Sequence, residues 1–146
     1  MKRELSGGFQ LDDDPSRIDL DAVHRYLSEE SYWAKGRTRE VQEEMNAQAA
    51  RLVGLYRDGR QMGFSRTALV AGMPMAYLAD VYVLAEHRRR GLGEELVRES
   101  VERGPYAAYR WLLHTRDMHG LYEKFGFGRP SERLMERPPA EVASGS

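Results

Sequence analysis

The stretch HRRRGLGEELV, residues 87–97, places three consecutive arginines directly before two glycines, Gly91 and Gly93. Apolar residues then recur at helical spacing and predict an amphipathic helix over residues 91–102. The preceding stretch MAYLADVYVL, residues 75–84, is the strongest strand pattern in the chain. A strand, a glycine-rich turn and a helix N-terminus leave backbone N–H groups unpaired around a concave anion site. The stretch therefore predicts a strand–turn–helix unit of an α/β domain, with a phosphate-bearing ligand at the turn.

Other phosphate motifs and a nucleic-acid patch are alternatives for this turn. A Walker A loop requires Lys-Ser/Thr after its last glycine, whereas Glu94 and Glu95 follow here, and a dinucleotide fingerprint requires a third glycine. The chain has 22 Lys and Arg against 23 Asp and Glu, which gives a net charge of −1. A general nucleic-acid or membrane binder usually carries a basic excess, so we expect no nucleic-acid and no membrane partner. A solvated basic turn stays open as an alternative.

The composition is that of one globular domain. With 146 residues, 41% of them hydrophobic, we expect a single domain over residues 1–146, flexible from about residue 138 onward. The absence of cysteine excludes disulfides and thiolate metal sites and is compatible with a reducing compartment. No segment approaches the roughly 18 apolar residues of a membrane span. We therefore predict a cytoplasmic protein, and no His/Asp/Glu spacing indicates a metal site.

Hydrophobic periodicity predicts the remaining elements. The Asp58-Gly59 pair favours a two-residue hairpin turn, and Asp117 is the expected N-cap of a short helix. Gly104 is the expected C-terminal cap of the helix over residues 91–102. Helices are expected over residues 20–27, from Thr38 onward and over residues 117–125. Strands are expected near residues 8–11 and over residues 52–56, 61–72, 75–84 and 109–115, with two more opening at FGF (125–127) and RLMER (133–137).

Two motifs resemble those of one enzyme family. VYVLAEHRRRGLGEELV, residues 81–97, resembles motif A of the GNAT superfamily of acyl-CoA N-acyltransferases, R/Q-x-x-G-x-G/A, and GLYEKFGF, residues 120–127, resembles its later L-Y-E-K and Gly-Phe signature. Their order matches the family, and the resemblance extends from about Leu52 to Phe127. It implies a single GNAT-like α/β domain with a mixed, mostly antiparallel sheet of six to seven strands. About four helices would flank this sheet, and its central strands would be splayed apart.

The resemblance implies an N-acetyltransferase that moves an acetyl group directly from acetyl-CoA to a primary amine of a small-molecule acceptor. In the family, motif A holds the CoA pyrophosphate, and the strand before it pairs its main chain with the pantetheine arm. Carried over, the cosubstrate-binding residues are Val81, Val83, Arg88, Arg89, Arg90, Gly91, Leu92 and Gly93. For Arg89 and Arg90, plain surface charge is the alternative. A second interpretation of the whole chain is a non-catalytic acyl-CoA sensor or regulatory module of the same fold.

Two residues are expected to move protons. Tyr122 matches the family's usual general acid, and a phenol with a pKa of about 10 can protonate a departing thiolate at neutral pH. Asp80 carries a carboxylate on an otherwise apolar strand that is expected to line the cleft. A buried carboxylate is costly unless it is paired with another group or has a function. Asp80 is predicted to act as base, proton relay or ligand of the substrate ammonium, and a structural salt bridge is the alternative.

The sequence defines the residues that bind the acceptor less clearly than those that bind the cosubstrate. In the family the loop between the first two helices builds much of the acceptor pocket, and here this loop supplies Tyr32, Trp33 and Arg37. We expect these residues and His114 to contact the acceptor through aromatic or charged groups. A loop that merely closes over the core is the alternative. The acceptor's identity stays open, and so does the choice between monomer and homodimer.

Overall fold

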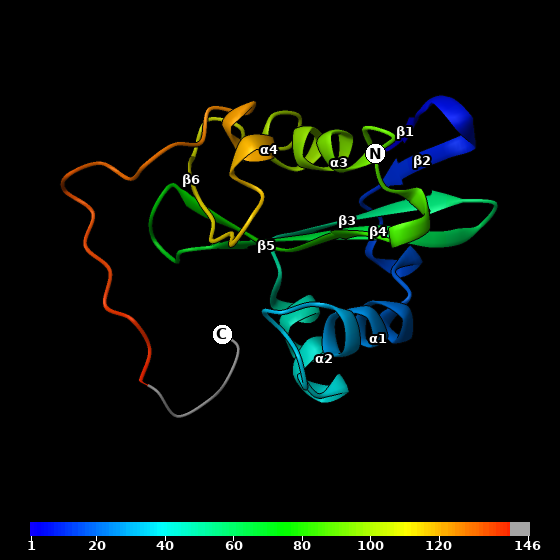
Figure 1. The fold of residues 1–146 in the computed structure, drawn as a ribbon, viewed down its shortest axis with the longest axis horizontal. Helices are drawn as coiled ribbons and strands as arrows, with labels where there is room; N and C mark the ends of the chain where they lie inside the picture. Colours follow the sequence, from blue (N-terminus) through cyan, green and yellow to red (C-terminus); the bar gives the residue numbers. More distant parts are fainter. Residues whose placement is uncertain (141–146) are drawn as a thin grey trace.

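Six strands pair in sequence order in a computed structural model that describes residues 1–140 (Figure 1). Every neighbouring pair is antiparallel except β5 and β6, which run parallel. This is the mixed, mostly antiparallel sheet that the sequence predicted. The strands are β1 (Lys2–Glu4), β2 (Phe9–Asp12), β3 (Arg51–Arg57), β4 (Arg60–Leu69), β5 (Met75–Val83) and β6 (Arg110–Leu112).

Four α-helices cover the two faces of the sheet, with α1 and α2 on one face and α3 and α4 on the other (Figure 1). Side-chain oxygens cap the first pair: Asp19 accepts from the Ala22 N–H, and Thr38 accepts from the Val41 N–H. The helices are α1 (Leu20–Glu30), α2 (Arg39–Gln48), α3 (Leu92–Val101) and α4 (His119–Glu123), with 3₁₀ turns at Ser6–Gly8, Pro15–Arg17 and Ala85–His87. No helix within residues 1–140 is long and apolar enough to cross a membrane.

The periodicity identified the central elements correctly. Asp58 and Gly59 have φ values of 52° and 76°, so the turn between β3 and β4 is the predicted hairpin with two left-handed residues. The first helix begins at Leu20 as expected but continues to Glu30 instead of ending at Leu27. The tail expected from residue 138 lies largely beyond the part of the chain that the structure describes.

Several predicted element ends are wrong. Asp117 does not cap α4, because the N-cap is Met118, whose N–H donates to the Thr115 hydroxyl. Helix α3 ends at Val101, one residue before the predicted end, but its C-cap is Glu102 and not Gly104. Close packing explains why residue 104 is a glycine, since a Cβ there would lie 2.4 Å from a guanidinium nitrogen of Arg51.

The outer strands of the sheet also differ from the prediction. The single strand expected near residues 8–11 is a pair, β1 and β2, and β6 covers only part of the expected 109–115. Neither FGF nor RLMER forms a strand, and residues 124–140 contain none. Phe125 and Phe127 pack instead against the cluster formed by Leu78, Val97 and Val101, which removes them from strand pairing. The sheet therefore reaches six strands through the additional N-terminal strand β1 and not through a strand after β6.

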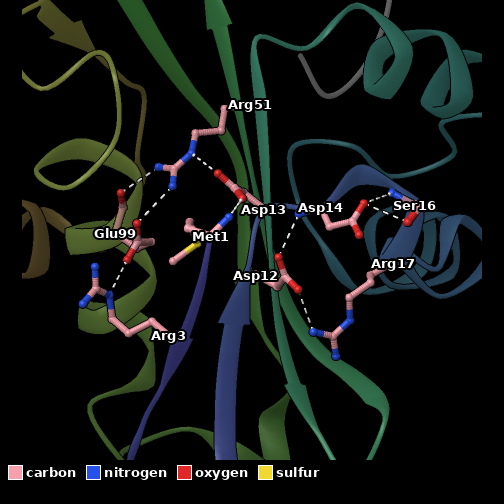
Figure 2. A network of polar contacts seen from close by, with 9 residues as sticks. All are labelled: Met1, Arg3, Asp12, Asp13, Asp14, Ser16, Arg17, Arg51 and Glu99. Carbon is pink, nitrogen blue, oxygen red and sulfur yellow. Dashed lines mark hydrogen bonds and ion pairs between the residues drawn. The ribbon is translucent and has the colours of Figure 1, made fainter.

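A buried ionic network attaches the N-terminal hairpin to α3 (Figure 2). Glu99 points inward from α3 with a side chain only 1% exposed, and its carboxylate accepts from Arg3 at 2.7 Å and from Arg51 at 3.0 Å. Arg51 also donates to the Glu99 carbonyl at 2.8 Å and to Asp13 at 3.1 Å. Asp13 in turn accepts from the amino group of Met1 at 2.7 Å. The network explains why an apolar helix face carries a glutamate.

Strands β5 and β6 separate after a short parallel contact. They pair only from Met75 to Tyr77 on β5 and from Arg110 to Leu112 on β6. Within the described residues, no strand pairs with this edge of β5 beyond Tyr77. A splay of strands was expected from the family resemblance, but it lies between the last two strands at one edge of the sheet and not between central strands. It opens the sheet at the position where the predicted site residues lie.

A β-bulge interrupts β5 within the separated part. The register to β4 shifts between Phe64 and Arg66, so that Asp80 and Val81 both lie opposite Ser65. Asp80 occupies the left-handed region with a φ of 51°, a conformation that Asp tolerates better than most residues. A bulge reverses the in–out alternation of a strand, and here it decides which face receives Asp80.

Candidate active site

A cavity of about 1090 Å³ extends from the loop between α1 and α2 to the separated strands. This volume is slightly above the range of about 300–1,000 Å³ that is typical of small-molecule sites. The cavity brings together seven of the predicted site residues from four separate segments. These residues are Tyr32, Trp33, Arg37, Asp80, Val81, His114 and Tyr122.

Asp80 is the centre of a charge cluster beside this cavity. Its Oδ1 accepts from the Trp33 indole at 2.8 Å, and its Oδ2 accepts from Arg37 at 2.8 Å and from Arg66 at 2.9 Å. Burial raises the pKa of Asp80, but the guanidinium groups of Arg66 and Arg37 outweigh burial, so the pKa lies below its usual value. The carboxylate is therefore ionised and fully engaged.

These contacts are the salt bridge given as the alternative for Asp80. The side chain is 1% exposed, whereas Arg37 and Arg66 are 14% and 13% exposed, so the arginines present more surface to the cavity. A general base needs a pKa near the working pH, and two adjacent guanidinium groups move the Asp80 pKa in the opposite direction. A direct role of Asp80 in proton transfer stays a prediction.

Tyr122 lies on α4 at the edge of the cavity. Its ring contacts Phe127 edge-on, with centroids 5.8 Å apart. Its hydroxyl has no hydrogen-bond partner among residues 1–140, yet it is not one of the fully buried unpaired atoms, so it keeps accessible surface. Burial raises the pKa of Tyr122 to about 12, which keeps the phenol protonated at neutral pH. The residue can donate a proton to a group bound in the cavity.

A chain of three side chains lies in the same cavity. The Tyr77 hydroxyl on β5 is hydrogen-bonded to Nδ1 of His114, and Nε2 of His114 lies 2.6 Å from a carboxylate oxygen of Glu136. Tyr77 is half-buried, and burial raises its pKa above the usual value. His114 is 70% exposed, so the chain connects a cavity-lining phenol to solvent. His114 was expected to contact the acceptor; the structure places it in the cavity with these two partners.

Tyr32 closes one side of the cavity. Its hydroxyl accepts from the Arg116 N–H at 2.9 Å, and the Arg116 guanidinium lies 4.0 Å from its ring centroid. These contacts connect the loop between α1 and α2 to the segment that precedes α4. The predicted acceptor loop therefore takes part in the cavity wall, and its contact with an acceptor stays a prediction.

The predicted phosphate turn lies at the N-terminus of α3, outside this cavity. Gly91 is the N-cap with a φ of 75° and no side chain caps the helix, so the first-turn N–H groups are available to an anion. A Cβ at Gly91 or at Gly93 would meet nothing within 4 Å. Arg89 and Arg90 are exposed and form no ion pair within the described residues. These features fit a pyrophosphate.

Arg88 and Val83 are connected to each other. The Arg88 Nε donates to the Val83 carbonyl at 3.0 Å, and its Nη2 donates to the Tyr26 hydroxyl at 2.6 Å. The side chain thus anchors the turn to β5 and α1, a role that the motif did not indicate. The Val83 carbonyl can still accept a second hydrogen bond, since it has two lone pairs. Leu92 is buried in the core, so only its backbone can contact a ligand.

Sequence reasoning missed three members of this site. Arg66 lies in a strand with no motif, Tyr77 precedes the bulge, and Glu136 lies in a segment that was expected to be a strand. Only their contacts with Asp80 and His114 identify them, and no sequence pattern encodes those contacts. Within residues 1–140 no group of three or more His, Asp or Glu side chains has the arrangement of a metal site.

Comparisons with known proteins agree on one family. Residues 20–127 match the acetyltransferase (GNAT) family. FG08082 of Gibberella zeae, whose name assigns it to the acetyltransferases, is 25% identical over 141 residues, covering 82% of this chain and 79% of that protein. A crystal structure from Xanthomonas campestris pv. campestris, described as belonging to the GNAT family, shares 34% identity with a TM-score of 0.81, covering 92% of this chain and 95% of that chain.

A more distant structure has the same fold with a ligand. It is a GNAT family acetyltransferase from Brucella melitensis in complex with acetyl-CoA. It shares 18% identity with a TM-score of 0.66, and the match covers 83% of each chain.

Proposed function

Because the chain belongs to the acetyltransferase (GNAT) family, we propose that it is an N-acetyltransferase that uses acetyl-CoA to acetylate a primary amine of a small molecule. The observation that carries this proposal is the separation of β5 from β6 beyond Tyr77. Within residues 1–140 it leaves one edge of β5 unpaired between the helix N-terminus of α3, which no side chain caps, and the unpaired, partly accessible hydroxyl of Tyr122. The acetyl-CoA complex of the Brucella melitensis relative supports the choice of cosubstrate.

The residues at the α3 turn suit the phosphate end of acetyl-CoA. Backbone N–H groups from Gly91 to Gly93 would hold the pyrophosphate, because neither position carries a side chain that excludes it. Arg89 and Arg90 would add charge-assisted hydrogen bonds. The main chain of Val81 and Val83 would pair with the pantetheine amides along the open edge of β5. Acetyl-CoA supplies the acetyl group as a thioester, which needs no acyl-enzyme.

Tyr122 is the proposed general acid. Its protonated hydroxyl lies in the cavity, and it would donate its proton to the departing thiolate sulfur. The pKa of about 12 means that Tyr122 recovers a proton from water or from the acceptor after each turnover.

The proposed route for the acceptor's proton is the chain Tyr77–His114–Glu136. The ammonium would give a proton to the Tyr77 oxygen while the Tyr77 hydroxyl proton passes to Nδ1 of His114. Glu136 would hold the resulting imidazolium at Nε2, and the exposed imidazolium would release the proton to solvent. Asp80 would orient Arg37 and Arg66 instead of accepting this proton.

Calorimetric titration with acetyl-CoA tests the proposal. The wild-type protein is expected to bind acetyl-CoA and free CoA, and a Gly93→Glu variant is expected to lose both. The variant should remain folded, because the position is open and an acidic side chain in the first turn of a helix is favourable. No binding to the wild type would overturn the proposal.

A screen for release of free CoA thiol separates turnover from sensing. An amine that causes release in the wild type, but not in Tyr122→Phe, supports the enzyme. Acetyl-CoA binding without release by any amine of a broad panel would support the alternative, a non-catalytic acyl-CoA sensor of the same fold.

A further inference from the structure

Two guanidinium groups share a single carboxylate in the cavity wall. Arg37 and Arg66 come from different segments, and both donate to the same oxygen of Asp80, at 2.8 Å and 2.9 Å. Asp80 is 1% exposed, while the two arginines are 14% and 13% exposed. The charge that the cluster presents to the cavity is therefore positive, because two cations face one buried anion.

Both arginines line the cavity and keep guanidinium donors without a hydrogen-bond partner among residues 1–140. Within residues 1–140, Nε and Nη2 of Arg37 and both terminal nitrogens of Arg66 have no hydrogen-bond partner. Only Tyr56 Oη and His87 Nδ1 are fully buried, unpaired side-chain atoms in this part of the chain. The free guanidinium nitrogens thus have accessible surface, and both residues line the cavity.

The other charges of the cavity do not neutralise this excess. Glu136 is engaged by His114, and Asp117 lies 3.9 Å from Arg116. Lys35 and Arg137 also line the cavity and add positive charge. Both form no ion pair within the described residues. The cavity therefore has a net positive character near Arg37 and Arg66.

We infer that the acceptor carries a carboxylate beside its primary amine and that Arg37 and Arg66 bind this carboxylate. A planar guanidinium with free donors matches a carboxylate in charge and geometry. Asp80 holds both guanidinium groups beside one carboxylate oxygen, which pre-organises the site before the ligand arrives. Tyr32 and Trp33 line the same cavity and suit an acceptor with an apolar or aromatic body. This inference rests on the proposed function and specifies its substrate class as amino acids or related amino carboxylates.

Binding of small probes tests the anion site without turnover. Protein saturated with acetyl-CoA would be titrated with benzoate and with benzamide, which have the same shape and differ in charge. Benzoate is expected to bind at least about 10-fold more tightly, since a hydrogen bond to a charged group is worth more than one to a neutral group. In Arg66→Gln this preference is expected to disappear.

Arg60→Gln is the matched control, because Arg60 is exposed at the opposite end of the same strand. It is expected to keep the preference for benzoate. Arg66→Gln leaves Asp80 paired with Arg37 and Trp33, which protects the fold. If that variant nevertheless fails to fold, the wild-type comparison decides by itself.

Turnover tests the same inference with L-phenylalanine, L-phenylalaninamide and 2-phenylethylamine, and with the corresponding sets for the other amino acids. Amino acids with a free carboxylate are expected to be better substrates than their amides or decarboxylated amines, because their KM should be lower. Equal or better use of the amides and decarboxylated amines, together with equal binding of benzoate and benzamide, would overturn the inference but leave the acetyltransferase intact. Failure of acetyl-CoA itself to bind would overturn the proposed function instead.

Discussion

Leu78 and Asp80 are two residues apart on β5, yet they face opposite sides of the sheet. Leu78 packs with Val97 and Val101 of α3, whereas Asp80 contacts Trp33 and Arg37 on the face covered by α1 and α2. In a regular strand, residues i and i+2 share a face. The bulge opposite Ser65 reverses this alternation and transfers the carboxylate to the cavity side.

Asp80→Asn is expected to destabilise the protein and weaken acceptor binding. Asn tolerates the left-handed conformation of this residue, so the backbone is kept, but Arg37 and Arg66 lose the charge between them. The free energy of unfolding should fall by about 3 kcal/mol, the usual cost of removing one partner of a buried ion pair. Urea unfolding at neutral pH measures this change.

Steady-state kinetics of Asp80→Asn distinguishes positioning from proton transfer. A positioning residue raises the KM for the acceptor and leaves the affinity for acetyl-CoA unchanged. A loss confined to kcat, with stability and KM unaffected, would instead make Asp80 the proton acceptor that the sequence suggested.

Glu99→Gln is expected to show how far the fold depends on the ionic network beneath α3. The variant leaves Arg51 without its buried carboxylate, so about 3 kcal/mol of unfolding free energy should be lost at pH 7. Burial raises the pKa of Glu99, but hydrogen bonds from Arg3 and Arg51 outweigh it and lower the pKa below its usual value. The stabilisation is therefore complete above the ordinary glutamate pKa of about 4.3 and is lost as the pH falls through the folded-state value.

The free energies of unfolding of wild type and Glu99→Gln should thus converge as the pH falls below the ordinary glutamate pKa and through the lowered folded-state pKa. Glu102→Gln at the C-cap of the same helix is the control, because Glu102 is 51% exposed and lies 4.0 Å from its partner Arg98. Its effect should stay below about 0.5 kcal/mol at any pH. A pH-independent difference for Glu99→Gln would contradict the ionic explanation.

Tyr122→Phe is expected to lower kcat by about 10²-fold or more without changing stability. The hydroxyl has no partner among residues 1–140, and the ring contact with Phe127 is kept in the variant. Because the pKa is about 12, the wild-type kcat should not decline between pH 8 and pH 10 through loss of this proton. Tyr106→Phe is the control and should be neutral, because Tyr106 does not line the cavity. An unchanged kcat in Tyr122→Phe would exclude the residue as the acid.

The elements that hold the site were predictable, because helices and strands follow local periodicity. The turn at Gly91 and Gly93 and the position of Tyr122 were identified from motif resemblance. The bulge at Asp80 was not, since it depends on pairing with a strand far away in sequence. Arg66 could not be predicted for the same reason, because only its hydrogen bond to Asp80 on the neighbouring strand identifies it as a member of the site. Polar residues of this kind acquire a role only from tertiary neighbours.

His114→Asn and Glu136→Gln are expected to lower kcat/KM for the acceptor by about 10- to 100-fold. Each variant interrupts the proposed proton route from Tyr77 to solvent. The affinity for acetyl-CoA should not change. The loss should be smaller at high pH, where the acceptor amine is already neutral.

His119→Asn is the matched control for this route, because His119 is exposed at the start of α4 and outside the chain of three side chains. Comparable losses in His119→Asn and His114→Asn would show that the effect is not specific to the relay. Full activity in Glu136→Gln would restrict the route to Tyr77 and His114.

Alanine at Gly91 and alanine at Gly93 are expected to have different effects on stability and on affinity. Gly91 has a φ of 75°, so Gly91→Ala should destabilise the free protein by about 1 kcal/mol. Gly93 lies inside α3, where Gly93→Ala should be neutral or stabilising by about 0.5 kcal/mol. The motif R/Q-x-x-G-x-G/A allows Ala at the position of Gly93 but requires Gly at the position of Gly91, whose left-handed backbone shapes the turn. Gly91→Ala should therefore bind acetyl-CoA at least about 10-fold more weakly by calorimetry, whereas Gly93→Ala should keep its affinity and is the matched control. Undiminished affinity in a folded Gly91→Ala protein would place the pyrophosphate away from this turn.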